Sequence, residues 1–113
     1  SKVPVVVAAI MKELRRLTSE LVEKKELLKA KDHLIGGLFL GVETSDELAS
    51  FYGGQEIITR KLLSPEAVAK QVEKVSAEEL RAVARDFFKD SRLCLTAIGP
   101  YRSNKEFGKL LKL

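Results

Sequence analysis

The stretch RLCLTAIGP, residues 92 to 100, is the most strand-like part of the sequence and decides how the fold is interpreted. Its aliphatic character favours a β-strand, whereas most of the remaining chain has helical periodicity. A strand satisfies its backbone N–H and C=O groups through a neighbour, and no obvious second strand is present. Each buried backbone group without a partner would cost about 1 to 3 kcal/mol, a large share of a typical folding free energy of about 5 to 15 kcal/mol.

Residues 92–98 are therefore expected to obtain their sheet from elsewhere. We favour a polypeptide segment outside these 113 residues. A second copy of the chain, paired through the strand edge 92–98, and a less obvious strand within these 113 residues are the alternatives. The same residues could also form a short extended connector that ends at Gly99 and Pro100.

Apolar residues at helical spacing predict a first helix from about Pro4 to Arg16, with the proline in its first turn. A long second helix is expected from about Glu23 to Val42. It contains three glycines, each of which costs about 1 kcal/mol relative to alanine. Close packing of a neighbouring helix or a hinge would explain them; they are Gly36, Gly37 and Gly41.

The pattern resumes at Leu48, either as a kinked continuation or as a third helix to about Lys61. Two further helices have clear start signals. Ser64 is an expected N-cap before Pro65 and Glu66, and Ser76 and Glu79 are expected to form a capping box. The buried stripe of the last of these helices would comprise Leu80, Val83, Ala84, Phe87 and Phe88. A similar capping box, Ser103 and Glu106, predicts a short terminal helix through Phe107, Leu110 and Leu111.

Composition excludes several classes of protein. The chain has 113 residues, of which 45% are hydrophobic and 32% charged, as expected of one domain or part of one. The net charge is +4, but basic and acidic residues alternate as on solvated helix faces, so no nucleic-acid partner is expected. No apolar run reaches the roughly 20 residues that span a bilayer. The single cysteine, Cys94, excludes an internal disulfide and favours a cytoplasmic location.

Few residues could carry chemistry. His33 has no second histidine or cysteine nearby, so a surface or partly buried histidine is favoured over a zinc ligand. Glu43, Asp46 and Glu47 could form a carboxylate site, but more simply they cap and charge the start of the following helix. Cys94 is expected to be a small core residue. The aromatic pairs could mark a peptide-binding surface, although helical periodicity places at least one member of each in the core; they are Phe51-Tyr52 and Phe87-Phe88.

In order along the chain, four short matches resemble the final part of a half-domain in the pitrilysin/insulinase-type zinc metallopeptidases, the mitochondrial processing peptidase-like family. The resemblance covers nearly the whole sequence. One departure is Glu23, because the family's long helix usually has a Ser or Thr cap there. The matches are Glu26-Leu27 with Ala30-Lys31, Glu43-Thr44-Ser45, VSAEELRAVAR from Val75 to Arg85, and the closing Ile98-Gly99-Pro100.

The resemblance implies an α+β half-domain whose helices pack on one face of an antiparallel sheet. Residues 1–113 would be a single partial domain, mainly helical, that supplies the helical layer and the last strand, with the rest of the sheet before Ser1. The family's zinc motif is H-x-x-E-H with a further Glu. It cannot be present here, because His33 is the only histidine. The family's peptide-binding arginine and tyrosine also precede the matched region.

The resemblance therefore implies a C-terminal, non-catalytic part of a zinc-dependent peptidase, which helps to enclose a peptide substrate and hydrolyses nothing by itself. No catalytic or metal-binding residue is expected in this chain, its substrate-binding residues are unassigned, and zinc belongs to the intact parent, a zinc metalloendopeptidase. The missing N-terminal part of the same protein would be its main partner. A catalytically inactive peptidase-like subunit and a stand-alone basic helical interaction module are the alternatives.

Overall fold

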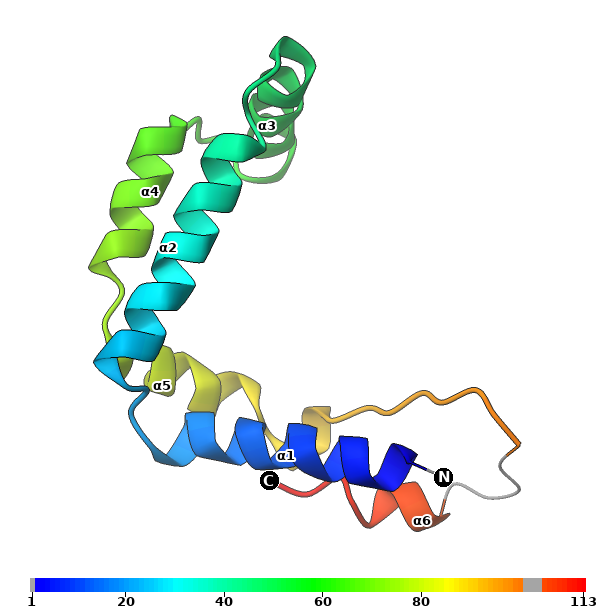
Figure 1. Cartoon of the computed structure of the whole chain (residues 1–113). Helices are drawn as coiled ribbons and strands as arrows, with labels where there is room; N and C mark the ends of the chain where they lie inside the picture. The colour runs from blue at the N-terminus through cyan, green and yellow to red at the C-terminus, as the bar shows by residue number, and fades with distance from the viewer. Residues whose placement is uncertain (1, 101–104) are drawn as a thin grey trace. The chain divides into compact units, whose positions relative to one another are not determined.

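The computed structural model of the chain describes residues 2–100 and 105–113. Six α-helices lie in the described part, together with one turn of 3-10 helix, Asp90–Arg92 (Figure 1). The α-helices are α1 Val3–Ser19, α2 Lys24–Leu40, α3 Ser45–Ile58, α4 Pro65–Lys74, α5 Ala77–Phe87 and α6 Lys105–Gly108. The chain divides into two compact units. Unit 1 comprises Ser1–Val22 and Ala77–Leu113, and unit 2 comprises Glu23–Ser76.

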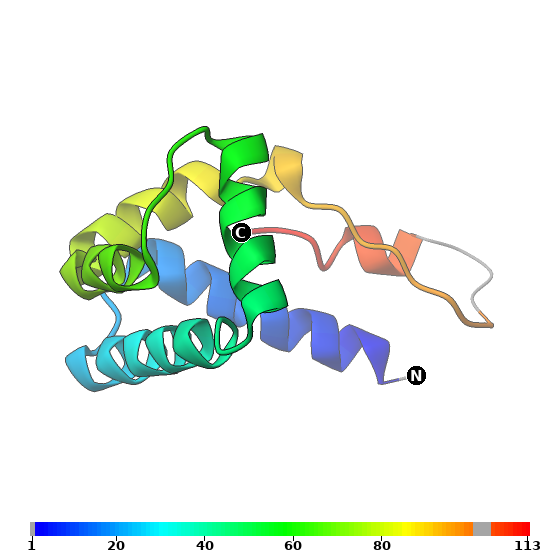
Figure 2. The ribbon, with the colours of Figure 1, turned by 90° about the horizontal axis from the view of Figure 1, so that it is seen from above.

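Unit 1 is built on α1 and α5, which lie antiparallel in both views of the ribbon (Figures 1 and 2). Its buried side chains are Val7, Met11, Ala84 and Phe107, of which Met11 is the most buried at 2% exposure. The end of the chain is held by two hydrogen bonds. The Arg15 guanidinium donates to the carbonyl oxygen of Lys112 at 2.5 Å, and the N–H of Leu113 donates to Asp90 Oδ1 at 2.7 Å.

In unit 2, α2 packs against α4 in an antiparallel arrangement (Figure 1). Lys31 Nζ on α2 donates to the carbonyl oxygen of Glu73 in the last turn of α4, at 2.8 Å. That carbonyl is one of those that a helix end leaves without an intrahelical partner. The loop between α3 and α4 is held by Gln55. Its Nε2 donates to the Leu63 carbonyl at 3.1 Å, and the Leu63 N–H donates to its Oε1 at 2.9 Å.

The predicted start signals are confirmed where the structure describes them. Pro4 lies in the first turn of α1, and the N–H of Ala67 donates to Ser64 Oγ at 3.2 Å, as an N-cap requires. The Ser76 and Glu79 capping box stays a prediction. The expected box of Ser103 and Glu106 falls on residues 103 and 106; residue 103 lies outside the described residues, as does the side chain of residue 106.

Three boundaries differ from expectation. The helix α1 continues to Ser19 instead of ending near Arg16, because the Thr18 and Ser19 hydroxyls donate back to the Arg15 carbonyl, each at 2.8 Å. The helix α3 is a separate helix and ends at Ile58, before Arg60 adopts a positive φ of 52°. The helix α2 ends at Leu40 instead of near Val42, and Glu23 at its N-cap makes no side-chain capping bond.

The strand-like stretch is extended from Leu93 onward, but residue 92 belongs to the 3-10 turn. No strand is present in the described ranges, and within them residues 94–98 make no hydrogen bond. The described fold is therefore mainly helical, and the sheet that the resemblance implies is not part of it.

Candidate functional site

An open apolar groove lies between α1 and α5 in unit 1. Its volume is about 360 Å³, and all of its lining side chains are apolar: Leu17, Leu80, Val83, Ala84, Phe87 and Phe88. Ala84 is buried, whereas Val83 and Phe87 are 59% and 64% exposed. The apolar stripe predicted for α5 is therefore only partly buried, and most of the Phe87 side chain is exposed in the open groove.

The apolar surface extends along one edge of α1. Val6 and Ile10 are each 54% exposed and lie on the same stripe as Leu17, because residues four and eleven apart share a helix face. Val7 and Met11 lie on the neighbouring, buried stripe. The helix is thus apolar over a wider arc than its contact with α5 covers. We call Val6, Ile10, Leu17, Val83 and Phe87 the open face of unit 1.

The total accessible surface of the chain also indicates that its helices are incompletely covered. The chain exposes 9092 Å². Even two separate compact proteins of half its mass would together expose only about 7,500 Å². The two units therefore expose more surface than folded domains of their size normally do. Large exposed apolar patches mark protein or membrane interaction sites or ligand-binding grooves.

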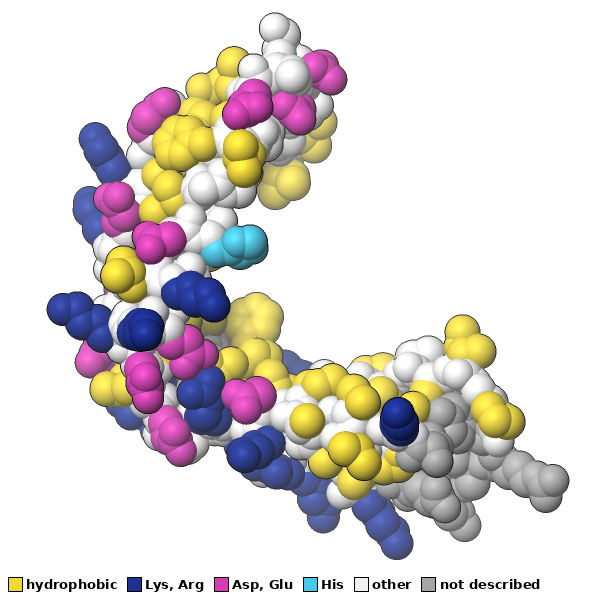
Figure 3. Space-filling view, viewed as in Figure 1, with side chains coloured by type: hydrophobic (Ala, Val, Ile, Leu, Met, Phe, Trp, Pro, Cys, Tyr) yellow, Lys and Arg dark blue, Asp and Glu magenta, His cyan; other side chains and the backbone are white. Residues whose placement is uncertain are grey.

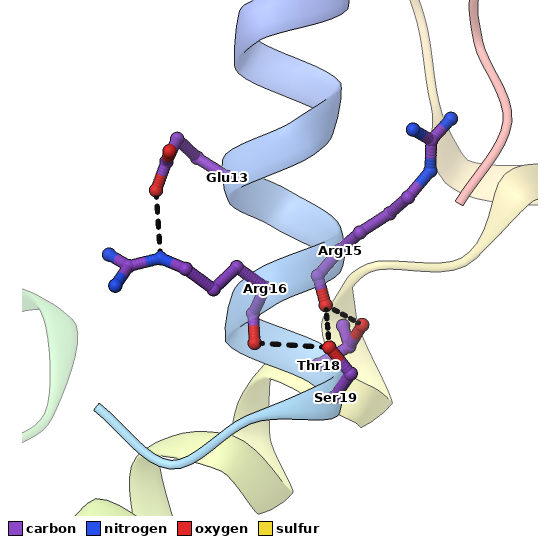
Figure 4. A network of polar contacts seen from close by, with 5 residues as sticks. All are labelled: Glu13, Arg15, Arg16, Thr18 and Ser19. Carbon is purple, nitrogen blue, oxygen red and sulfur yellow. Dashed lines mark hydrogen bonds and ion pairs between the residues drawn. The ribbon is translucent and has the colours of Figure 1, made fainter. Parts of the chain in front are cut away.

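Polar groups near the open face are engaged in holding the helices. Arg85 Nε on α5 donates to the Thr18 carbonyl at 2.8 Å, at the end of α1. Figure 4 shows the same helix end, where Arg16 pairs with Glu13 at 3.0 Å and the two hydroxyls bond the Arg15 carbonyl. The hydrogen bonds to carbonyls satisfy part of the C-terminal end of α1, so they serve its structure and offer no reactive group.

One carboxylate of unit 1 has a shifted pKa. A hydrogen bond from Lys89, at 2.9 Å, and the charges of Lys89 and Arg92 hold the pKa of Asp86 below its ordinary value. Because Asp86 is solvated, this interaction orders the end of α5 and does not create an acid or base for catalysis.

The acidic residues at the start of α3 form a cap, as predicted. Thr44 and Glu47 make a reciprocal capping box, in which the Thr44 N–H donates to Glu47 Oε2 at 3.0 Å. Hydrogen bonding to Thr44 lowers the pKa of both Asp46 and Glu47. Sequence reasoning missed Thr44 itself, although the T-x-x-E spacing from Thr44 to Glu47 was a signal for it.

The other predicted candidates do not come together. His33 lies on α2 in unit 2 and is exposed (Figure 3), and Cys94 is an exposed free thiol in unit 1. The expectation that Cys94 is a core residue is wrong for this chain, because nothing in the described part covers the extended segment. In that part, no three His, Cys, Asp or Glu side chains are grouped to hold a metal ion.

Phe51 and Tyr52 contact each other edge to face at 5.3 Å, and both are half-buried. Phe88 is half-buried beside the exposed Phe87, so in each aromatic pair at least one ring packs inward, although none of the four rings is fully buried. None of the described helices is both long and apolar enough to cross a membrane.

Fold and site together define a mainly helical segment with an exposed apolar face in unit 1. Curated proteins similar to the chain are beta subunits of the mitochondrial-processing peptidase and uncharacterized zinc proteases. The mitochondrial-processing peptidase subunit beta of Saccharomyces cerevisiae is 30% identical over 97 residues, which is 86% of this chain and 21% of that protein. Uncharacterized zinc proteases of Mycobacterium tuberculosis and Mycobacterium leprae are 32% and 28% identical over 108 residues, covering 88% and 96% of the chain and 24% of each protein.

These similarities confirm the recognition made from sequence: the chain is a relative of processing-peptidase beta subunits and zinc proteases, as expected for the pitrilysin-like family. It spans about a fifth to a quarter of the length of these relatives. No protein-family model matches the chain, and no solved structure is a significant match.

Proposed function

We propose that the chain is a non-catalytic, C-terminal part of a zinc-dependent peptidase, in which it helps to enclose the peptide substrate. Two observations carry the proposal: the open face of unit 1, and the extended residues 94–98, which make no hydrogen bond within the described part of the chain. Leu93 and Leu95 are half-buried, whereas Cys94 and Thr96, which alternate with them, are exposed. This alternation is typical of a strand with one face on a helical layer.

In this proposal, the remaining strands belong to the polypeptide before Ser1. They pair with residues 93–98 and lay their apolar side chains on the open face. Covering Val83 and Phe87 removes the exposed apolar surface, and pairing satisfies the backbone groups of residues 94–98. In the isolated chain, a second copy paired through the same edge is the competing partner.

The zinc of the intact peptidase would be held outside this chain, where it would polarise the peptide carbonyl and activate a water molecule. Unit 1 contributes a wall of the chamber and a surface for the sheet, and neither unit contributes a proton donor or acceptor to hydrolysis. A cytoplasmic location and the absence of a nucleic-acid partner stay predictions.

The test is to express the complete reading frame, the 113-residue chain, and the remainder separately. Zinc content by elemental analysis and cleavage of an unfolded fluorogenic peptide are then measured for each, and for the mixed pieces. We expect zinc and cleavage in the complete protein, and cleavage restored when the remainder is mixed with the chain.

Stoichiometric zinc or hydrolysis in the 113-residue chain alone would contradict the proposal. A complete protein that folds but binds no zinc would identify an inactive peptidase-like subunit. A chain that unfolds cooperatively as a monomer, and binds a ligand in a salt-sensitive way, would identify a stand-alone basic module.

A further inference from the structure

The second half of α2 is apolar on all sides. The nine residues from Leu34 to Val42 contain no polar side chain. A helix on the surface of a soluble protein normally has a polar face, and one that is hydrophobic all round is normally buried. Yet Leu34, Phe39 and Leu40 are 60%, 39% and 67% exposed.

The contact with α4 accounts for only one side of this half-helix. Leu27, Lys31, Ile35 and Leu38 are half-buried and share a face, and Lys31 donates to α4 from it. Since each residue advances by about 100°, Gly36 and Leu40 lie on the opposite side. We call Gly36 and Leu40 the outer face of α2.

Gly36 is not explained by any described neighbour. A Cβ built there would meet no atom within 4 Å, and its backbone φ is not positive. Glycine is among the poorest helix formers, so alanine would favour this helix. Because a glycine has no side chain, it allows another backbone or side chain to approach the helix closely.

We propose that the outer face of α2 is an interface with the polypeptide that the proposed function places before Ser1, separate from the sheet on unit 1. The inference rests on the proposed function. Relatives are four to five times as long as the matched region, so most of such a protein lies outside it and would be covalently linked to this face. A tethered segment competes at a high effective concentration, which favours it over a second copy as the occupant.

The test compares each variant in two contexts, the 113-residue chain and the complete protein. In the chain alone, Gly36→Ala should raise the melting temperature by about 3 to 6 °C, because helix propensity improves and nothing clashes. In the complete protein, the same change should lower it, because the new methyl group meets the neighbour. Leu40→Lys should leave the chain unchanged and lower the melting temperature of the complete protein.

Ser50→Ala is the matched control, since Ser50 is exposed on α3 and outside the outer face; its effect should be the same in both contexts. If the complete Gly36→Ala protein does not fold while the same variant of the 113-residue chain does, this also shows that the substitution destabilises only the complete protein. An equal gain in both contexts, or a loss in the chain alone, would overturn the interface. Zinc content and cleavage by the unsubstituted complete protein decide the proposed function independently.

Discussion

The two units are stabilised in different ways. Each contains a pair of antiparallel helices in which a basic residue of one helix donates to a C-terminal carbonyl of the other: Arg85 to Thr18 in unit 1 and Lys31 to Glu73 in unit 2. Unit 1 buries Val7, Met11, Ala84 and Phe107, whereas in unit 2 the described buried residues are only Pro65 and Ala69. Unit 2 is instead held by side-chain bonds to backbone at its caps and at Gln55.

Their charges differ as well. Unit 1 contains twelve Lys and Arg against seven Asp and Glu, and unit 2 contains eight against nine. The whole excess of positive charge is therefore in unit 1. Arg85, Arg92 and Arg15 each donate to a backbone carbonyl there, so part of the excess has a structural use. The net charge of +4 is therefore a poor guide to binding partners, because part of it comes from arginines that donate to backbone carbonyls of the same unit.

The largest effect is expected at the centre of unit 1. Met11→Ala should lower the free energy of unfolding by about 2 to 3 kcal/mol, near the lower end for buried methionine because the core is shallow. Urea unfolding followed by circular dichroism measures it. Val5→Ala, at a position 71% exposed, is the control and should have almost no effect. Similar losses for both variants would show that unit 1 has no distinct core.

A polar counterpart in unit 2 is Gln55. Gln55→Leu keeps the size of the side chain but leaves the Leu63 N–H and C=O partly buried without partners, which should cost about 1 to 2 kcal/mol. The measurement is the same urea titration, with hydrogen exchange at Leu63 as a local readout. Gln71→Leu, on the exposed side of α4, is the matched control. If the two variants behave alike, the side-chain clamp does not stabilise unit 2.

Periodicity and start signals were enough to predict most of the helices. They predicted α4 and its Ser64 cap because cap, proline and acid are local features. They could not predict the groove beside Phe87, because an apolar stripe has the same sequence whether a neighbour covers it or not. The expectation for Cys94 was wrong for this reason: burial in a strand depends on the strand's neighbours.

The side chains that donate hydrogen bonds from one helix to another, here called the cross-helix donors, also could not be predicted from the sequence. Lys31 and Arg85 belong to the segments that resemble the peptidase family, but their spacing shows only that they lie on helices. Their acceptors, Glu73 and Thr18, are 42 and 67 residues away. Such pairs follow from which helices pack together, which is a tertiary property.

The cross-helix donors allow a direct comparison of the units. Lys31→Met should cost about 1 kcal/mol, because the Glu73 carbonyl loses a charged donor in a half-buried position. Arg85→Met should cost less, because Arg85 is exposed. Thermal unfolding of both variants tests this order, with the exposed Lys29→Met as control. The reverse order would mean that the Arg85 contact stabilises unit 1 more than the Lys31 contact stabilises unit 2.

The smallest expected effect is a response to acid. In unit 2, Thr44 lowers the pKa of Asp46 and Glu47, and a hydrogen bond with Ser64 lowers that of Glu66; in unit 1, a hydrogen bond with Lys89 lowers the pKa of Asp86, at the end of α5. A carboxyl whose pKa is lower when folded stabilises above its ordinary value, here 3.8 to 4.5, and loses this as pH falls through the lowered value. Amides at the starts of α3 and α4 should therefore lose exchange protection before those at the start of α1 in unit 1, whose first turn has no acidic residue. Glu47→Gln, which keeps the capping bond but cannot titrate, should flatten the response of α3 alone. Simultaneous loss in both units would show that the caps do not distinguish them.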